Sequence, residues 1–159
     1  MHAIGHPEIA FRDVQPGDLE ELYRIDQLCF AEGIAYSRYE LSHYLKQRGA
    51  FGIAVERSGQ IMAFIVANRR RSVGHIITID VLPQARRMQL GSGLLNSAES
   101  RLRTEGCDSV YLEVAVDNAA AISFYKRHAY FVLSTLPRYY NGEVDALRMG
   151  KRLDSKTSD

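Results

Sequence analysis

The sequence predicts an α/β (α+β) fold: a mixed, mostly antiparallel sheet of about seven strands with a parallel pair in its middle, flanked by about four helices. Segments with strand-like alternation are interspersed with segments whose apolar residues recur at helical spacing. A strand–helix–strand run over residues 74–116 requires a right-handed crossover and hence a parallel pair. Short turns on either side of that run imply antiparallel neighbours. At 159 residues, we expect residues 1–159 to form a single domain.

The first half of the chain supplies three strands and two helices. Asp18 is expected to cap the first helix, with Glu21 three residues later completing a capping box. Ser58-Gly59 marks a hairpin turn between two strands. The expected elements are a strand at 9–12, a helix from 18 to about 29, a helix at 38–47, and strands at 52–56 and 61–68.

The second half alternates between the two kinds of element. Gly106 is expected to end a long helix, and Asn118 to cap a short one. The expected elements are a strand at 74–82, a helix at 91–104, a strand at 109–116, a helix at 118–128, a strand at 130–136, a loop at 137–143 and a strand at 144–151. The polar residues 154–159 are expected to form a frayed tail.

Composition excludes several classes of function. A formal net charge of +1 argues against nucleic-acid binding, and Arg69-Arg70-Arg71 is interpreted as a solvated hairpin tip. Cys29 and Cys107 have no metal-like spacing with the histidines, so we expect neither a metal nor a disulfide. We find no signal-peptide or membrane-spanning pattern, and therefore expect a soluble, cytoplasmic protein.

A glycine-containing turn links a strand to the long helix. Arg86 and Arg87 precede Gly91-Ser92-Gly93, which begin that helix. A helix N-terminus offers unpaired N–H groups and a positive dipole end, so this turn is a candidate phosphate site. An ordinary strand-to-helix turn with exposed arginines is the alternative. The segment resembles the phosphate-loop signature of the GNAT superfamily, in which Arg or Gln precedes Gly-x-Gly or Gly-x-Ala.

Gln89 stands where that family usually has its first glycine. We therefore expect either that residue 89 keeps a negative φ or that Gly91 and Gly93 supply the flexibility. The resemblance implies that acetyl-CoA is the cofactor and that the chain has the GNAT fold. The cofactor-binding residues that it implies are Ile79, Val81, Arg86, Arg87, Gln89, Gly91, Ser92, Gly93, Asn118 and Tyr125.

A second motif follows, with Leu112-Glu113-Val114 ending a strand, Asn118 opening a helix, and Phe124-Tyr125 later in that helix. This cadence resembles the bacterial ribosomal-protein-alanine N-acetyltransferases. The resemblance makes Glu113 the candidate base and Tyr125 the candidate acid. From the residues alone, a solvated or salt-bridged acid is the favoured interpretation of Glu113, and a core aromatic is the alternative for Tyr125.

A third motif, Arg138-Tyr139-Tyr140-Asn141-Gly142, resembles the substrate loop of protein N-terminal acetyltransferases. The resemblance implies that Tyr139, Tyr140 and Tyr36 bind substrate. A tyrosine-rich turn without a ligand is the alternative.

The implied reaction is direct attack of a primary amine on the acetyl thioester, without a covalent enzyme intermediate. An α-amine has a pKa of about 7.7–8.0 and lysine about 10.4, so deprotonating lysine costs about 3.5 kcal/mol more. This favours a protein N-terminus, such as that of a ribosomal protein, as acceptor. A small-molecule amine or lysine acetyltransferase is the alternative, and a non-catalytic acyl-CoA sensor is an alternative of another class. We expect a monomer or weak homodimer.

Overall fold

A computed structural model describes residues 8–153 of the chain, so the expected frayed tail at 154–159 lies outside the described residues. The elements are β1 (Ile9–Asp13), η1 (Pro16–Asp18), α1 (Leu19–Cys29), α2 (Arg38–Lys46), β2 (Phe51–Arg57), β3 (Gln60–Arg70), β4 (Val73–Val81), η2 (Pro83–Met88), α3 (Leu90–Thr104), β5 (Ser109–Ala115), α4 (Ala119–Arg127), β6 (Phe131–Tyr140) and β7 (Val144–Arg152). The predicted order of helices and strands is confirmed, with boundaries that differ by one to a few residues.

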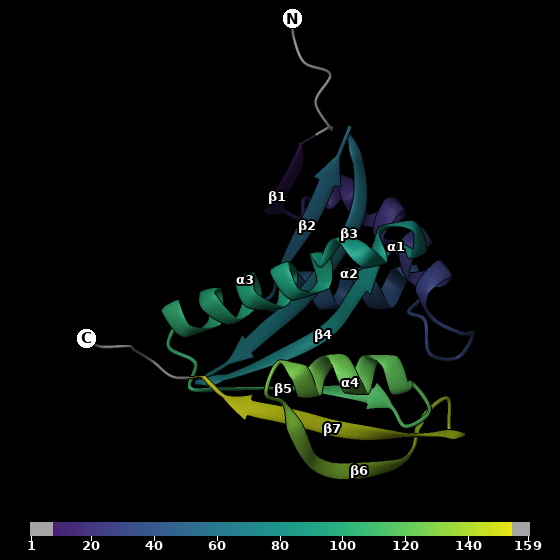
Figure 1. Cartoon of the computed structure of the whole chain (residues 1–159), viewed down its shortest axis with the longest axis vertical. Coiled ribbons are helices and arrows are strands. Elements are labelled where there is room, and N and C mark those ends of the chain that lie inside the picture. The colour runs from purple at the N-terminus through teal and green to yellow at the C-terminus, as the bar shows by residue number, and fades with distance from the viewer. Residues whose placement is uncertain (1–7, 154–159) are drawn as a thin grey trace, which may run out of the picture.

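The strands form one seven-stranded sheet in the order β1-β2-β3-β4-β5-β7-β6. The pair β4–β5 is parallel and the other pairs are antiparallel, as predicted. The parallel ladder covers only the starts of the two strands and ends at His75 opposite Tyr111. Beyond that point β4 and β5 diverge, and the sheet opens between its β1–β4 part and its β5–β7–β6 part (Figure 1).

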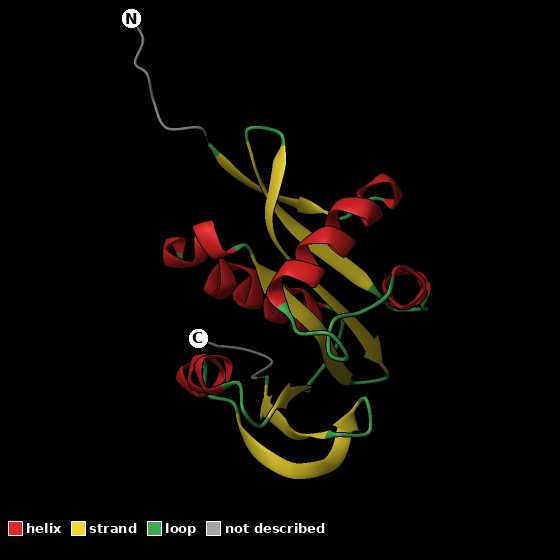
Figure 2. Cartoon of the chain, turned by 90° about the vertical axis from the view of Figure 1, so that its right-hand side faces the viewer, coloured by secondary structure: helices red, strands yellow, loops and turns green. Residues whose placement is uncertain are grey.

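Helices cover both faces of the sheet (Figure 2). On one face, α3 and α4 pack over the larger core, in which Leu94, Leu95 and Leu102 meet Val110 and Leu112. On the other face, α1 packs over a smaller core with Phe64 of β3 at its centre. Alternate residues of β5 therefore face different layers, and Tyr111 and Glu113 point away from α3.

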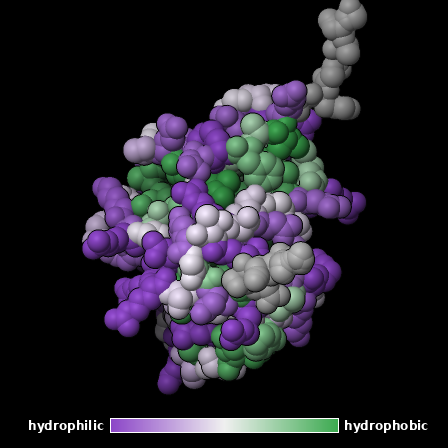
Figure 3. Space-filling view, turned by 90° about the vertical axis from the view of Figure 1, so that its left-hand side faces the viewer, coloured by the Kyte–Doolittle hydropathy of each residue, from purple (hydrophilic) through white to green (hydrophobic). Residues whose placement is uncertain are grey.

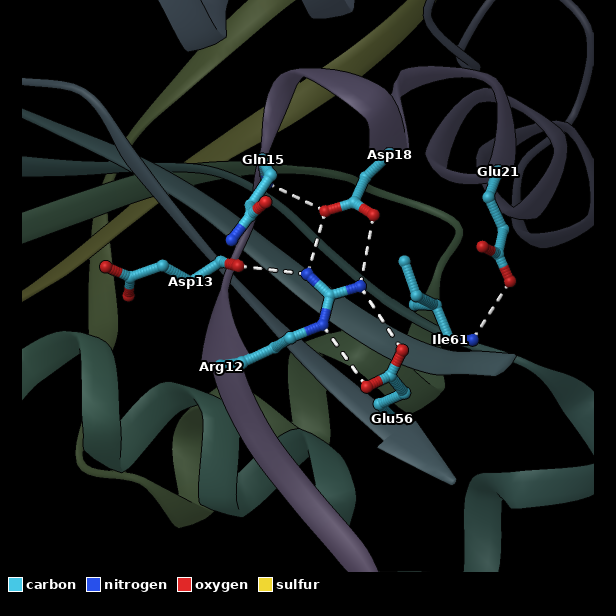
Figure 4. A network of polar contacts seen from close by, with 7 residues as sticks. All are labelled: Arg12, Asp13, Gln15, Asp18, Glu21, Glu56 and Ile61. Carbon is cyan, nitrogen blue, oxygen red and sulfur yellow. Dashed lines mark hydrogen bonds and ion pairs between the residues drawn. The ribbon is translucent and has the colours of Figure 1, made fainter. Parts of the chain in front are cut away.

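The expected capping box of α1 is wrong, because a different network recruits both acids (Figure 4). The Arg12 guanidinium donates to both oxygens of Asp18, at 2.8 and 3.0 Å, and also pairs with Glu56. Asp18 accepts from the Gln15 N–H at 2.7 Å, while Glu21 accepts from the Ile61 N–H at 2.9 Å. The two acids thus tie the start of α1 to β1 and β3. Sequence spacing alone cannot show this competition.

The predicted loop at 137–143 is largely strand. β6 continues to Tyr140, and its register with β7 shifts between Leu136 and Tyr140. Pro137 lies in this irregular stretch, where its lack of an N–H costs no ladder hydrogen bond. The bulge and the turn that follows place Tyr139 and Tyr140 at one end of the sheet.

Candidate active site

Glu113 lies on β5 next to the place where the sheet opens, and its side chain is 7% exposed. Its Oε1 is 2.7 Å from Nε2 of His75 on β4. Its Oε2 accepts from Nε and Nη2 of Arg148, at 3.1 and 2.9 Å. Glu113 and Arg148 are direct cross-strand partners on β5 and β7. Glu113 is thus a salt-bridged acid, as one of the alternatives held, and the catalytic role of Glu113 remains a prediction.

The surroundings of Glu113 keep its carboxylate ionised. Burial by itself raises its pKa, but the hydrogen bonds and charges of His75 and Arg148 outweigh burial, so the net pKa is lowered. A carboxylate with a lowered pKa is a weak base. In this site it is better suited to orient the His75 ring than to take up a proton alone.

His75 and Arg148 are functional candidates that the sequence did not reveal. The His75 ring stacks on Tyr111, with centroids 4.2 Å apart and planes 8° apart. The Arg148 guanidinium also lies over the Tyr111 ring, 5.1 Å from its centroid. The only signal in the sequence is that each lies in a strand. The strand order and register, which the sequence does not state, bring both side chains to Glu113.

The three predicted substrate tyrosines lie near this cluster. Tyr139 and Tyr140 meet edge to face, with ring centroids 4.9 Å apart. Tyr36, between α1 and α2, meets Tyr44 at 5.4 Å and donates its hydroxyl to the Ile77 carbonyl at 3.4 Å. Burial raises the pKa of Tyr36, with further contributions from Tyr44, Tyr140 and Tyr139. The pKa of Tyr139 is also raised, first by burial and next by the negative charge of Glu113.

The segments next to these tyrosines are in contact. A Cβ on Gly33 would lie 3.2 Å from Nδ2 of Asn141, and Gly33 itself has a φ of +90°. The α1–α2 segment and the β6–β7 turn therefore form a joint wall on the side of the sheet where Glu113 points.

Tyr125, the candidate acid, comes from α4 and is 9% exposed within the larger core. Its ring meets Phe124 and Tyr130, at centroid distances of 5.3 and 5.8 Å. Burial, followed by the influence of Asp80 and Tyr140, raises its pKa, so the phenol is protonated at neutral pH. The structure thus makes Tyr125 a core aromatic, as the alternative held, and its role as a proton donor remains a prediction.

The predicted phosphate loop is η2 and the start of α3. Gln89 has a φ of +59°, so the expectation of a negative φ at this position is wrong, and the left-handed residue is Gln89 itself rather than Gly91 or Gly93. Gly91 and Gly93 instead allow close packing: an added Cβ would meet Phe124 at 3.4 Å or Phe11 at 2.8 Å. Arg86 Nε donates to the Val81 carbonyl at 3.0 Å, which fixes η2 against the end of β4.

The start of α3 fits a phosphate group. No side chain among the described residues caps this helix, whereas Ser37 caps α2 and Asn118 caps α4 through the Ala121 N–H. The Ser92 hydroxyl is engaged with Nε2 of His128, at 2.9 Å, so Ser92 offers its backbone N–H. Uncapped N–H groups at a helix start, beside Arg87, are what a pyrophosphate requires.

The end of β4 is the candidate site for the pantetheine chain of acetyl-CoA. Ile79 and Val81 pack against the α3–α4 side, and beyond His75 the β4 backbone has no strand partner on its β5 side among residues 8–153. A strand edge of this kind can hydrogen-bond to amide groups of a ligand. Cys29 lies close by and donates its thiol to the Val81 carbonyl at 3.4 Å; burial raises its pKa to about 11, so it is not a nucleophile at neutral pH.

Within residues 8–153, no group of three His, Cys, Asp or Glu side chains is arranged to hold a metal ion. Across that same part of the chain, none of the helices has the length and apolar character needed to cross a bilayer.

The central sheet opens between its two parallel strands, with the uncapped start of α3 on one face and the ionised Glu113 on the other. This arrangement suits an enzyme whose two substrates approach from opposite faces of the sheet. The sequence profile of the Acetyltransferase (GNAT) family matches residues 19–130, and the chain belongs to that family. It is an N-acetyltransferase with acetyl-CoA as cosubstrate.

Relatives and solved structures agree with this assignment. The chain is 28% identical to an N-alpha-acetyltransferase of Sulfurisphaera tokodaii, over 92% of this chain and 94% of that protein. It resembles the structure of Ard1 from Thermoplasma volcanium with a TM-score of 0.84 and 29% identity, covering 91% and 97% of the two chains. The ribosomal-protein-S18-alanine N-acetyltransferase from Escherichia coli has the same fold, with a TM-score of 0.84, 23% identity, and 96% and 97% of the chains covered.

Proposed function

We propose that this enzyme acetylates the N-terminal α-amine of a protein. The observation that carries the proposal is the juxtaposition of the His75–Glu113 pair with a tyrosine-lined wall, made by the α1–α2 segment and the end of β6 with its turn, on the face of the sheet opposite the candidate phosphate site. The names of the Sulfurisphaera tokodaii and Sulfolobus acidocaldarius relatives, both N-alpha-acetyltransferases, support the same acceptor class. A ribosomal protein is one such acceptor.

The surface beside the site is suited to a peptide. A hollow of about 350 Å³ lies next to Tyr111 and Arg148, and Val73, Phe131 and Leu133 give it an apolar lining. Phe131 and Leu133 are 56% and 52% exposed, and Figure 3 shows hydrophobic surface low on the molecule, where β6 runs. A small amine would not need this surface, whereas residues that follow an N-terminus can use it.

In the proposed mechanism, acetyl-CoA supplies the acetyl group as a thioester. The N–H groups at the start of α3 and Arg87 bind its phosphates, and the β4 edge near Ile79 and Val81 aligns the chain that carries the thioester. His75, oriented by Glu113, accepts the proton that the attacking amine releases. The Tyr125 phenol returns a proton to the departing sulfur, since it is protonated at neutral pH. Arg148 keeps Glu113 ionised and fixed in place.

The candidate acceptors differ in the pKa of their amines. An α-amine with a pKa of about 7.7–8.0 is partly neutral at physiological pH, while lysine needs about 3.5 kcal/mol more to lose its proton. A single histidine–carboxylate pair is therefore better suited to deprotonating an α-amine than a lysine side chain. Lysine or small-amine acetylation is the second candidate, and a sensor without activity is the third.

Free-thiol release from acetyl-CoA tests this proposal, using purified protein with N-terminal peptides, the same peptides blocked at the α-amine and carrying an internal lysine, and polyamines. We expect release with free α-amines alone. Release confined to lysine peptides or polyamines would replace the proposed acceptor. Acetyl-CoA binding without release on any amine would favour the sensor.

A further inference from the structure

Two carboxyl groups that the proposed mechanism does not use lie together beneath α1. Asp26, in α1, and Asp80, near the end of β4, are each 0% exposed. The two carboxyls are close enough for each to shift the pKa of the other. Two ionised carboxylates cannot hydrogen-bond to each other, because neither has a proton to donate. A hydrogen bond between them therefore requires one proton.

The remaining contacts locate this proton. The Tyr36 N–H donates to Asp26 Oδ2 at 2.6 Å, and the Thr78 hydroxyl donates to Asp80 Oδ1 at 2.5 Å. The other two oxygens, Asp26 Oδ1 and Asp80 Oδ2, are buried without a hydrogen-bond partner among the described residues. A proton carried by Asp80 Oδ2 and donated to Asp26 Oδ1 satisfies all four oxygens.

The burial of the pair supports this protonation state. Burial raises the pKa of both carboxyls. The increase is pronounced at Asp80, where the neighbouring Asp26 adds to the effect of burial. The backbone N–H of Tyr36 favours the ionised form of Asp26. The charge therefore resides on Asp26 and the proton on Asp80.

The pair joins the two halves of the active site. Asp80 lies in the part of β4 beyond its contact with β5, between Ile79 and Val81. Asp26 holds the backbone of Tyr36, whose hydroxyl also reaches the Ile77 carbonyl of the same strand. The strand that we assign to acetyl-CoA is thus linked to the α1–α2 segment, which we assign to the acceptor.

We propose that Asp26 and Asp80 are a positioning pair, whose single shared proton holds Tyr36 and the α1–α2 segment against β4 and so shapes the acceptor side of the site. The identity of that side as the acceptor side rests on the function proposed above. Loss of the proton would leave two adjacent buried negative charges, which repel and weaken the attachment of the segment.

The groups that face the pair do not offset a second negative charge. Cys29 of α1, Tyr36 of the segment, Thr78 of β4 and Tyr125 of α4 are neutral at physiological pH. Glu40 of α2 is an acid whose charge further raises the pKa of Asp26. Arg86 of η2 donates to the Val81 carbonyl instead.

The test compares Asp80→Asn with the wild type. An asparagine amide can donate to Asp26 and accept from Thr78, so it imitates the protonated aspartate but cannot lose the proton. Infrared spectra should show a protonated carboxyl band in the wild type at neutral pH that Asp80→Asn lacks. Asp13→Asn, which changes a carboxyl that is 70% exposed, is the matched control and should retain the band.

The functional readouts are the pH dependence of the peptide KM and of amide hydrogen exchange over residues 30–37. In the wild type, KM should rise by up to about tenfold per pH unit once the pair loses its proton, and exchange should accelerate beyond its intrinsic pH dependence. Asp80→Asn should show neither change. Asp80→Ala, which leaves Asp26 Oδ1 without a donor, should raise KM at every pH tested.

The proposal is overturned if the wild type has no protonated carboxyl band at neutral pH, or if Asp80→Asn keeps the alkaline rise in KM or in exchange. If no peptide is acetylated, the proposed function fails, while the infrared and exchange measurements still decide whether the shared proton holds the segment.

Discussion

His75 Nε2 lies 2.7 Å from Glu113 Oε1, so an imidazole on β4 and a carboxylate on β5 form one hydrogen bond beside the point where the two parallel strands separate. This is the arrangement of a base and the group that orients it. With Nε2 facing the carboxylate, Nδ1 is the ring nitrogen left for a proton from the acceptor.

We expect Glu113→Gln and His75→Gln each to lower kcat/KM by about 10²-fold or more, since general-base catalysis contributes about 10²–10⁴-fold. Each is measured by thiol release with a peptide. Glu105→Gln, an acid paired with exposed arginines outside the site, is the control and should keep normal activity. Normal turnover in both site variants would remove the pair from the chemistry.

We expect that the fall of kcat/KM toward acid pH does not reflect protonation of Glu113. Its lowered pKa keeps the carboxylate ionised throughout the neutral range, and its favourable pairing is lost only when pH falls through that lowered pKa. The rise in kcat/KM between pH 6 and 8 should instead follow deprotonation of the acceptor amine, whose pKa is about 7.7–8.0 for an α-amine. The profile is recorded with two peptides whose α-amine pKa values differ. A limb that stays fixed for both would contradict this assignment.

Tyr125→Phe should lower kcat by about 10-fold or more and leave acetyl-CoA affinity nearly unchanged, because it removes a proton donor and keeps the ring. Steady-state kinetics and calorimetry separate the two effects. Tyr130→Phe is the matched control: its hydroxyl donates to buried Glu99 at 2.7 Å, so this variant should lose stability but keep kcat. Equal turnover in Tyr125→Phe and wild type would leave Tyr125 as a core aromatic only.

Gly91→Val should weaken acetyl-CoA binding by about tenfold or more, because a side chain at the start of α3 obstructs the approach of a phosphate. The fold should survive, since an added Cβ meets no atom closer than Phe124, at 3.4 Å. Calorimetric titration measures the affinity. Gly17→Ala, where a Cβ meets nothing within 4 Å, is the control. Normal binding by a folded Gly91→Val would show that the loop assignment is wrong.

Lys151→Met should destabilise the fold by up to about 3–5 kcal/mol, because within residues 8–153 the buried Glu99 charge then keeps only its longer ion pair with Arg103, at 3.9 Å. Lys151 Nζ lies 2.9 Å from Glu99 Oε1, and the Glu99 side chain is 3% exposed. Urea unfolding measures the change. Pairing Lys151→Met with Glu99→Gln should recover part of the loss. An additive effect in the double variant would show that the two side chains are not energetically coupled.

Local patterns in the sequence were sufficient for most elements of the fold. The spacing of Leu94, Leu95, Ala98 and Leu102 predicted α3, and Ser58-Gly59 predicted the β2–β3 turn, where both residues have positive φ. Asn118 caps α4 as expected. These features depend on residues within a few positions of one another, so hydrophobic periodicity and turn chemistry are enough to reveal them.

Tertiary structure decided the features that depend on distant partners. Asp18 and Glu21 satisfy the pattern of a capping box, yet Arg12 and the Ile61 N–H bind them instead. The composition of the loop did not show that Gln89 would take the left-handed conformation.

The sequence by itself determined the family of the protein and the candidate residues Glu113 and Tyr125, because their motifs are contiguous. Only the tertiary structure brought His75 and Arg148 to Glu113, and Asp80 to Asp26, because the members of these groups lie on different strands and helices. Strand register and helix packing set those distances, and the chemistry of a buried carboxyl is decided by which neighbour it meets.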